Sequence, residues 1–201
     1  MDDFALSVNE ASSSAIGYLL FTPLDFGYYH YDNISIRSAL FLHSLKKSAS
    51  PLEDQDVQKL YRRCLNDTNI TKSIPVYSAA YLKSPVIAGF WKPCIFLPVH
   101  LISDKNETDI RYMLLHELQH YKHKDGFINY LINLAGMIYW FNPFVWYALK
   151  EMRGDREIAC DSSVLNLLKS DDYVTYGNTL INFAEKISLT PFPFPPASEE
   201  I

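Results

Sequence analysis

The chain has 201 residues, 48% of them hydrophobic and 14% aromatic, and its formal net charge is −5. This length and composition predict one domain with a real core and exclude a disordered protein. No basic stripe offsets the acidic charge, so we expect no direct contact with nucleic acid. The cysteines Cys64, Cys94 and Cys160 form neither a C-x-x-C site nor a disulfide framework, which indicates a reducing compartment.

The first fifty residues show little regular pattern. The chain begins with an acidic Met-Asp-Asp where a signal peptide would be basic, so we expect no secretory signal. The apolar run at 15–21 is too short to cross a bilayer. Amphipathic helices are predicted at 34–47 and 52–66, and Pro51 suits the start of the second. Their apolar stripes consist of Ile36, Leu40, Phe41 and Leu45, and of Val57, Leu60, Tyr61 and Cys64.

The pattern changes to short β-type runs, separated by proline and glycine, between residues 74 and 98. These runs predict a small sheet of two or three strands with a turn from Gly89 to Pro93. An exposed edge strand presents unpaired backbone groups, so this segment either holds a peptide by strand addition or is a plain structural hairpin. Ser84 and Val86 are the candidate substrate contacts in it.

The pattern H-E-x-x-H occupies residues 116–120. Residues four apart lie on one helix face, about 6 Å apart along the axis, so His116 and His120 can hold one metal ion. Glu117 then lies where a general base would act on a water at a zinc ion. The alternative is a surface helix with two solvated histidines. His123 is a rival ligand, although the lysines beside it suggest a solvated helix end near Asp125-Gly126.

A second acidic motif, D-R-E-I-A-C-D, follows at 155–161. A catalytic zinc takes three protein ligands, and His-His-Glu is a standard set, so Glu157 is the candidate third ligand. Asp161 lies one helical turn further and can accept a hydrogen bond from the outer nitrogen of a ligand histidine. The alternative is a solvated helix face paired to Arg153 and Arg156.

Residues 127–149 carry no charge over a length that would suffice to cross a bilayer. Asn142 as a helix cap and Pro143 at the first helical position instead predict two helices, the first buried and the second carrying Glu157. The aromatic residues near the break suit either a membrane interface or a globular core. A last helix is predicted at 173–187, from which Tyr176 could reach the site and donate to an oxyanion, and a proline-rich extended tail follows.

These motifs together resemble the cytoplasmic zinc-peptidase domain of the BlaR/MecR bacterial β-lactam sensor-transducers. The resemblance covers roughly residues 50–185, with several motifs in the same order. They are S-P-V-I-A-G (84–89), P-C-I-F-L-P (93–98), L-H-E-L-Q-H (115–120), K-D (124–125), Y-W-F-N-P-F-V-W (139–146), E-I-A-C-D (157–161) and Y-G (176–177).

The resemblance implies a mostly helical α+β fold, zincin-like, with a small edge sheet (about 74–98) packed on the H-E-x-x-H helix. It implies a zinc metallopeptidase domain at 51–188, preceded by a segment (1–50) left from a membrane or linker region and followed by the tail (189–201). Zn²⁺ would be held by His116, His120 and Glu157, with Glu117 as the base.

The activity implied is that of a membrane-associated endopeptidase at the cytoplasmic face, which cleaves itself and acts towards a DNA-binding repressor of resistance genes. Family members also carry flanking membrane spans and an extracellular penicillin-binding domain, which we do not recognise in these 201 residues. The competing hypothesis is therefore a non-catalytic, zinc-stabilised module that binds a repressor or a membrane partner, with membrane contact through 127–149.

Overall fold

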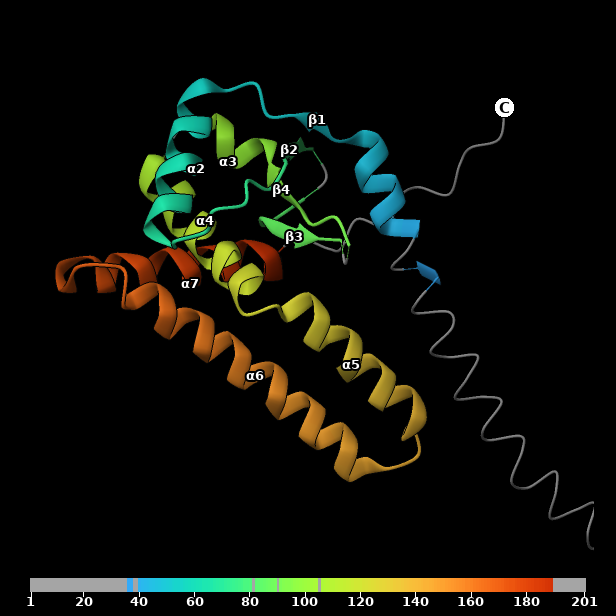
Figure 1. The fold of residues 1–201 in the computed structure, drawn as a ribbon. Coiled ribbons are helices and arrows are strands. Elements are labelled where there is room, and N and C mark those ends of the chain that lie inside the picture. Colours follow the sequence, from blue (N-terminus) through green and yellow to red (C-terminus); the bar gives the residue numbers. More distant parts are fainter. Residues whose placement is uncertain (1–35, 38–39, 81, 90, 105, 190–201) are drawn as a thin grey trace, which may run out of the picture.

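The computed structural model describes residues 36–37, 40–80, 82–89, 91–104 and 106–189 (Figure 1). The expectations for the apolar run at 15–21 and for the proline-rich tail therefore fall almost wholly outside the described residues. The described chain is mostly helical, with one small sheet, as predicted. Its elements are β1 (Ser50–Pro51), α2 (Gln55–Asp67), β2 (Val76–Ala79), β3 (Val86–Ala88), β4 (Cys94–Pro98), α3 (Val99–Ser103), α4 (Glu107–Lys122), α5 (Asp125–Ile138), α6 (Pro143–Leu165), a 3₁₀ turn η1 (Ser170–Asp172) and α7 (Tyr173–Leu189).

The two predicted N-terminal helices are present, with differences in detail. Residues 40–48 are helical, but of the stripe expected there only Leu45 is buried, while Leu40 and Phe41 are exposed. Helix α2 buries its whole predicted stripe. Its start is set by Asp54, whose side chain accepts hydrogen bonds from two backbone N–H groups of the first turn, and Pro51 lies in β1 instead.

The sheet has four strands in the order β1-β2-β4-β3 rather than the two or three expected. The additional strand β1 has only two residues, too few to give a period in the sequence. β2 pairs parallel with β4, and β3 pairs antiparallel with β4. β3 is thus an edge strand, as predicted, and it lies against α4.

Helix α4 is the centre of the fold, because it contacts α2, α5, α6, α7 and β3. Leu114, Leu115 and Leu118 on it are fully buried. Asn106 caps its start by accepting from the N–H groups of Thr108 and Asp109. The helix that bears the H-E-x-x-H pattern is therefore held on nearly all sides by the core.

Helices α5 and α6 form an antiparallel hairpin that projects from the rest of the molecule (Figure 1). Asn142 caps α6 and Pro143 begins it, as predicted. The chain turns at Lys124, whose φ is 59°, and Gly126 lies within α5 instead of ending α4. None of the described helices has both the length and the hydropathy needed to span a bilayer.

The prediction that α5 is buried is wrong. Only Asp125, Ile132 and Gly136 are buried in it. We call residues 127–149 the hairpin tip. Eleven large hydrophobic side chains of the tip are exposed: Phe127, Tyr130, Leu131, Leu134, Met137, Ile138, Tyr139, Phe141, Phe144, Trp146 and Tyr147.

Candidate metal centre

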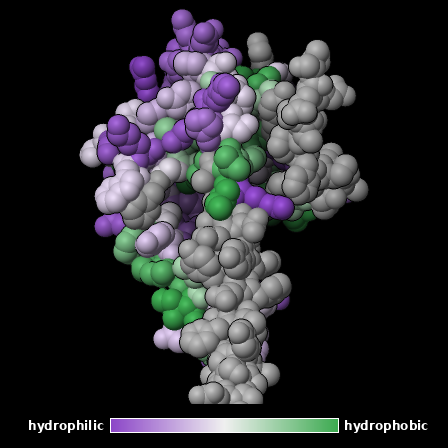
Figure 2. Space-filling view, turned by 90° about the vertical axis from the view of Figure 1, so that its right-hand side faces the viewer, coloured by the Kyte–Doolittle hydropathy of each residue, from purple (hydrophilic) through white to green (hydrophobic). Residues whose placement is uncertain are grey.

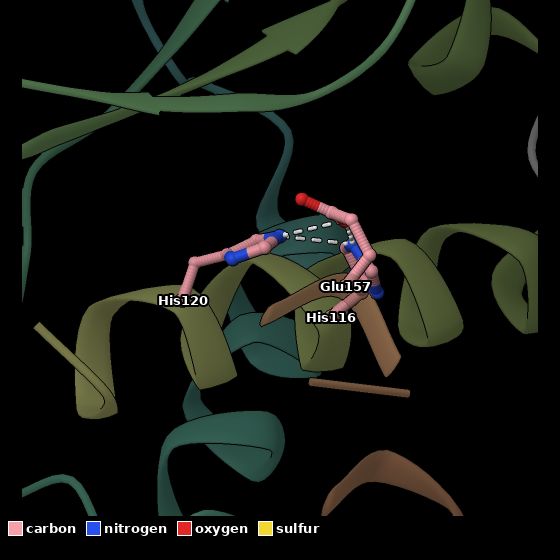
Figure 3. Close-up of side chains that lie close together, drawn as sticks. All are labelled: His116, His120 and Glu157. Atoms are coloured by element: carbon pink, nitrogen blue, oxygen red, sulfur yellow. Dashed lines mark hydrogen bonds and ion pairs between the residues drawn. The ribbon is translucent and has the colours of Figure 1, made fainter. Parts of the chain in front are cut away.

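Three side chains from two helices meet at one point (Figure 3). His116 and His120 lie on successive turns of α4, and their Nε2 atoms are 3.0 Å apart. Glu157, from α6, places Oε2 3.6 Å from the Nε2 atom of each histidine. Glu157 lies 41 positions after His116 and 37 after His120, and the three meet because α6 packs along α4.

The three donor atoms have the spacing that a metal ion needs. Donors at about 2.0–2.2 Å from a tetrahedral ion lie about 3.3–3.6 Å from one another. The observed separations of 3.0, 3.6 and 3.6 Å are within about 0.3 Å of this spacing. Burial, together with His120, lowers the pKa of His116, which favours the neutral imidazole that metals bind. The residues therefore fit a His-His-Glu site.

Each histidine has a carboxylate on its outer nitrogen. Asp161 Oδ1 lies 3.1 Å from His116 Nδ1, which is the contact predicted for Asp161. Asp125 Oδ2 lies 2.6 Å from His120 Nδ1. A carboxylate at Nδ1 keeps the proton there and leaves the Nε2 lone pair free to bind a metal.

The sequence reasoning missed Asp125, the first residue of α5. The sequence places it near the end of the preceding helix and in the K-D motif of the resemblance, without a role at the site. The signal available was a carboxylate five residues after His120, directly beyond the H-E-x-x-H helix. Recognising its role required the left-handed turn at Lys124, which brings the chain back towards α4.

Tyr176 reaches the site, as the sequence suggested, but on the outer side of His116. Its hydroxyl donates to Asp161 Oδ1 at 2.7 Å and lies 3.2 Å from His116 Nδ1. It is therefore behind the imidazole, on the side away from Nε2, because its position on α7 fixes it in the core. An oxyanion donor would have to face the open side of the cluster, so we reassign Tyr176 to positioning Asp161 and His116.

Glu117 is buried on α4 and faces β3. Its Oε2 atom accepts a hydrogen bond of 2.9 Å from the backbone N–H of Ile87. Burial raises the pKa of Glu117 to about 7, although His120 and the Ile87 N–H act in the opposite direction. Val86 lies beside Ile87 in β3 and Ser84 just before the strand, both half-buried, and their role as substrate contacts stays a prediction.

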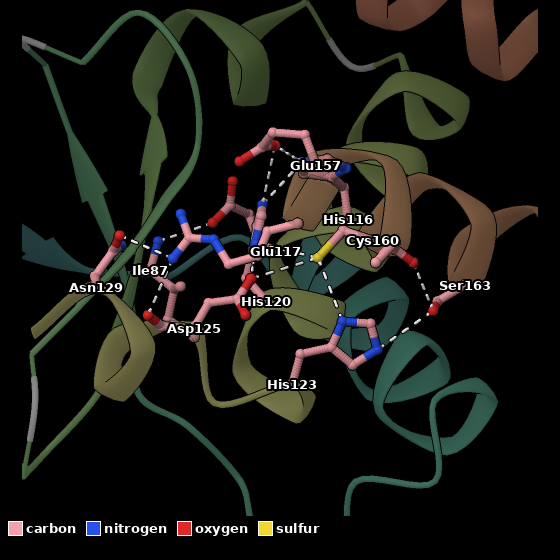
Figure 4. A network of polar contacts seen from close by, with 12 residues as sticks. Ile87, His116, Glu117, His120, His123, Asp125, Asn129, Glu157, Cys160 and Ser163 are labelled. Atoms are coloured by element: carbon pink, nitrogen blue, oxygen red, sulfur yellow. Dashed lines mark hydrogen bonds and ion pairs between the residues drawn. The ribbon is translucent and has the colours of Figure 1, made fainter. Parts of the chain in front are cut away.

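A polar network continues from the cluster towards the hairpin (Figure 4). Cys160 is buried with Sγ 3.2 Å from His120 Nδ1, and burial together with Asp125 raises its pKa to about 12. His123 contacts Cys160 and Ser163, on the outer side of His120, which argues against it as a ligand. Arg156 donates to Asn129 Oδ1 at 2.8 Å and does not pair with Glu157 in the way the solvated-face alternative required.

Comparison with known proteins gives one consistent family. The family model described as BlaR1 peptidase M56 matches residues 26–196. The chain is 32% identical over 183 residues to the regulatory protein BlaR1 of Bacillus licheniformis, which covers 91% of this chain and 30% of that protein. It is 28% identical over 180 residues to the methicillin resistance mecR1 protein of Staphylococcus aureus, covering 89% of this chain and 30% of that protein.

The chain thus spans about a third of the length of these relatives. Its matched part contains the fold and the His-His-Glu cluster described above. The family match covers far more than half of the chain, and the donor set suits the metal that a metallopeptidase requires. The chain belongs to the BlaR/MecR-type M56 family and is a metallopeptidase-type enzyme domain.

Proposed function

We propose that residues 51–188 form a zinc-dependent endopeptidase domain of the gluzincin type, with His116, His120 and Glu157 as ligands and Glu117 as general base. The observation that carries the proposal is the convergence of the three donor atoms, with separations of 3.0 to 3.6 Å, next to a buried carboxylate. When bound, Zn²⁺ supplies Lewis acidity, which makes water a stronger acid and polarises a peptide carbonyl.

Glu117 moves the protons in this proposal. Its carboxylate takes a proton from the attacking water and passes it to the leaving amine. The Ile87 N–H holds Oε2 at 2.9 Å, so that the carboxylate keeps one orientation between the two transfers. Asp161 and Asp125 hold the two imidazoles in the tautomer that leaves Nε2 free.

The edge strand β3 would hold the substrate. The Ile87 N–H points to Glu117, away from β4, so the Ile87 carbonyl lies on the same outer side of the strand. A peptide added along this edge would pass directly over Glu117 and the ligand cluster. Ser84 and Val86 precede Ile87 on this segment and are the residues we expect to contact the substrate backbone or side chains.

The proposed cellular role rests only on the similarity of the chain to its relatives and on their names. We propose that the domain works at the cytoplasmic face of a bacterial membrane, cleaves itself, and acts towards a transcriptional repressor in β-lactam resistance signalling. The non-catalytic alternative leaves the placement of Glu117 without a purpose, because a zinc-stabilised module needs the ligands but no buried carboxylate beside them.

The test compares metal content and cleavage in the same samples. Zinc is quantified by mass spectrometry in the parent and in Glu117→Gln, and self-cleavage is followed by intact-mass measurement. We expect about one zinc in both proteins and cleavage in the parent alone. A Glu117→Gln protein that cleaves as well as the parent would show that Glu117 is not the base. A parent that binds zinc and cleaves neither itself nor a peptide library would favour the binding module.

A further inference from the structure

The hairpin tip presents a large exposed apolar surface. It carries eleven exposed large hydrophobic side chains and no charged residue. In Figure 2 hydrophobic side chains gather on the lower part of the visible face, where the hairpin lies, while the upper part is largely hydrophilic. A contiguous apolar surface of this kind usually marks an interaction site.

The distribution of these side chains indicates what surrounds the tip. On α5 the exposed residues Phe127, Tyr130, Leu131, Leu134 and Ile138 repeat at helical spacing along one face. On α6 Phe144 and Trp146 are both exposed, although residues two apart point roughly 200° away from each other. The tip is therefore apolar on opposite sides. A single flat protein partner would cover only one side of the tip, whereas lipid would surround it on all sides.

The length of the charge-free part of α6 indicates how deeply the hairpin could enter a bilayer. Pro143 to Leu149 rises about 10 Å, and Lys150 is the first charged residue beyond it. This is the depth to which interfacial helices bury their apolar face, about 5–10 Å, and far less than the roughly 30 Å of a bilayer core. Lys150 and Arg153 would then lie at the level of the headgroups, where basic side chains are favoured.

Several backbone N–H groups in the turn at the end of the hairpin are satisfied within the hairpin. The N–H groups of Tyr139 and Asn142 donate to carbonyls of the hairpin, at 2.9 Å each. The Phe144 N–H donates to Asn142 Oδ1 at 3.0 Å, and Pro143 has no N–H to satisfy. These bonds lower the cost of taking this part of the turn out of water. The buried indole N–H of Trp140 has no partner among the described residues, which favours a shallow position of the turn over a deep one.

We propose that the α5–α6 hairpin inserts the end of its tip nearest the turn into one leaflet of a lipid bilayer, as a re-entrant anchor that does not cross it. Trp146 lies four residues before Lys150 and would be near the headgroups, where such rings are enriched, whereas Trp140 in the turn would lie deeper. This anchor goes beyond the peptidase proposal and does not depend on a metal.

Vesicle flotation of the full metal-loaded chain tests the anchor. The vesicles are phosphatidylcholine alone or phosphatidylcholine mixed with phosphatidylglycerol. The test variant is Phe144→Asp/Tyr147→Glu. Phe144 lies in the first turn of α6, where an acidic residue is compatible with the helix. The matched control is Val174→Asp, an equally exposed apolar residue in the first turn of α7.

We expect the parent and Val174→Asp to float with both kinds of vesicle, and the double variant to need at least about ten-fold more lipid. A folded parent that stays unbound, a double variant that floats like the parent, or an equal loss in Val174→Asp each overturns the anchor. So does a lipid-free dimer that the double variant dissociates while flotation is unchanged. Zinc is measured in the same fractions, so a failed anchor is distinguished from a failed metal site.

Fluorescence quenching measures the depth. The chain has three tryptophans, and Trp91→Phe leaves only those of the tip. Lipids brominated near the headgroup should quench their emission more than lipids brominated at the chain ends. Stronger quenching from the chain ends would overturn the shallow insertion.

Discussion

The two histidines of the candidate metal centre are supported in different ways. Asp125 lies 2.6 Å from His120 and is buried, and the thiol of Cys160 closes the same side. Asp161 lies 3.1 Å from His116, is partly exposed, and also accepts a hydrogen bond from Tyr176. A short contact away from water is stronger than a longer, shared and solvated one. We therefore expect the His120 side to contribute more to metal binding than the His116 side.

Removing both histidines should cause the largest loss of zinc binding in this comparison. His116→Ala/His120→Ala should contain no zinc, because one carboxylate from a half-exposed Glu157 cannot hold the ion alone. Metal content of the purified protein measures this, with circular dichroism as the control for folding. A variant that keeps its zinc would move the site away from α4.

Asp125→Asn should have the next largest effect. It leaves His120 with a weaker acceptor in a buried position, and we expect a loss of about 100-fold in zinc affinity. Competition with a chromophoric chelator gives the affinity. A loss of less than about three-fold would mean that the contact with Asp125 does not orient His120.

Asp161→Asn should weaken zinc binding by about 10-fold, less than Asp125→Asn, because water reaches this carboxylate. The same chelator competition applies. The order of the two asparagine variants is the decisive result, and an inverted order would show that the His116 side dominates.

Tyr176→Phe should have the smallest effect on the metal, about three-fold, because it removes only a hydrogen bond to Asp161. Cleavage should fall no more than metal occupancy does. If cleavage by the fully loaded variant fell by more than about 100-fold, Tyr176 would act on the reaction itself, as the sequence first suggested.

The sequence predicted features that depend on local periodicity better than features that depend on tertiary packing. Helical spacing, which is local, puts His116 and His120 on one face of α4 and Glu157 and Asp161 on one face of α6. The meeting of the two pairs depends on the packing of α6 along α4, which ligand chemistry suggested and spacing alone did not give. Asp125 was missed because its role depends on one left-handed residue, Lys124, that no periodicity announces. The exposure of α5 was missed because an apolar helix reads the same whether a core or lipid covers it.

The base of the hairpin has a thermodynamic consequence. Asp125 begins α5 and contacts His120, Glu157 is part of α6, and Arg156 joins the two helices through Asn129. Ion and bilayer would thus bind to opposite ends of the same two helices. If lipid binding changes the zinc affinity of the protein by some factor, zinc binding must change the lipid affinity by the same factor. Titrating either one in the presence of the other would give a single coupling free energy for this pair of helices.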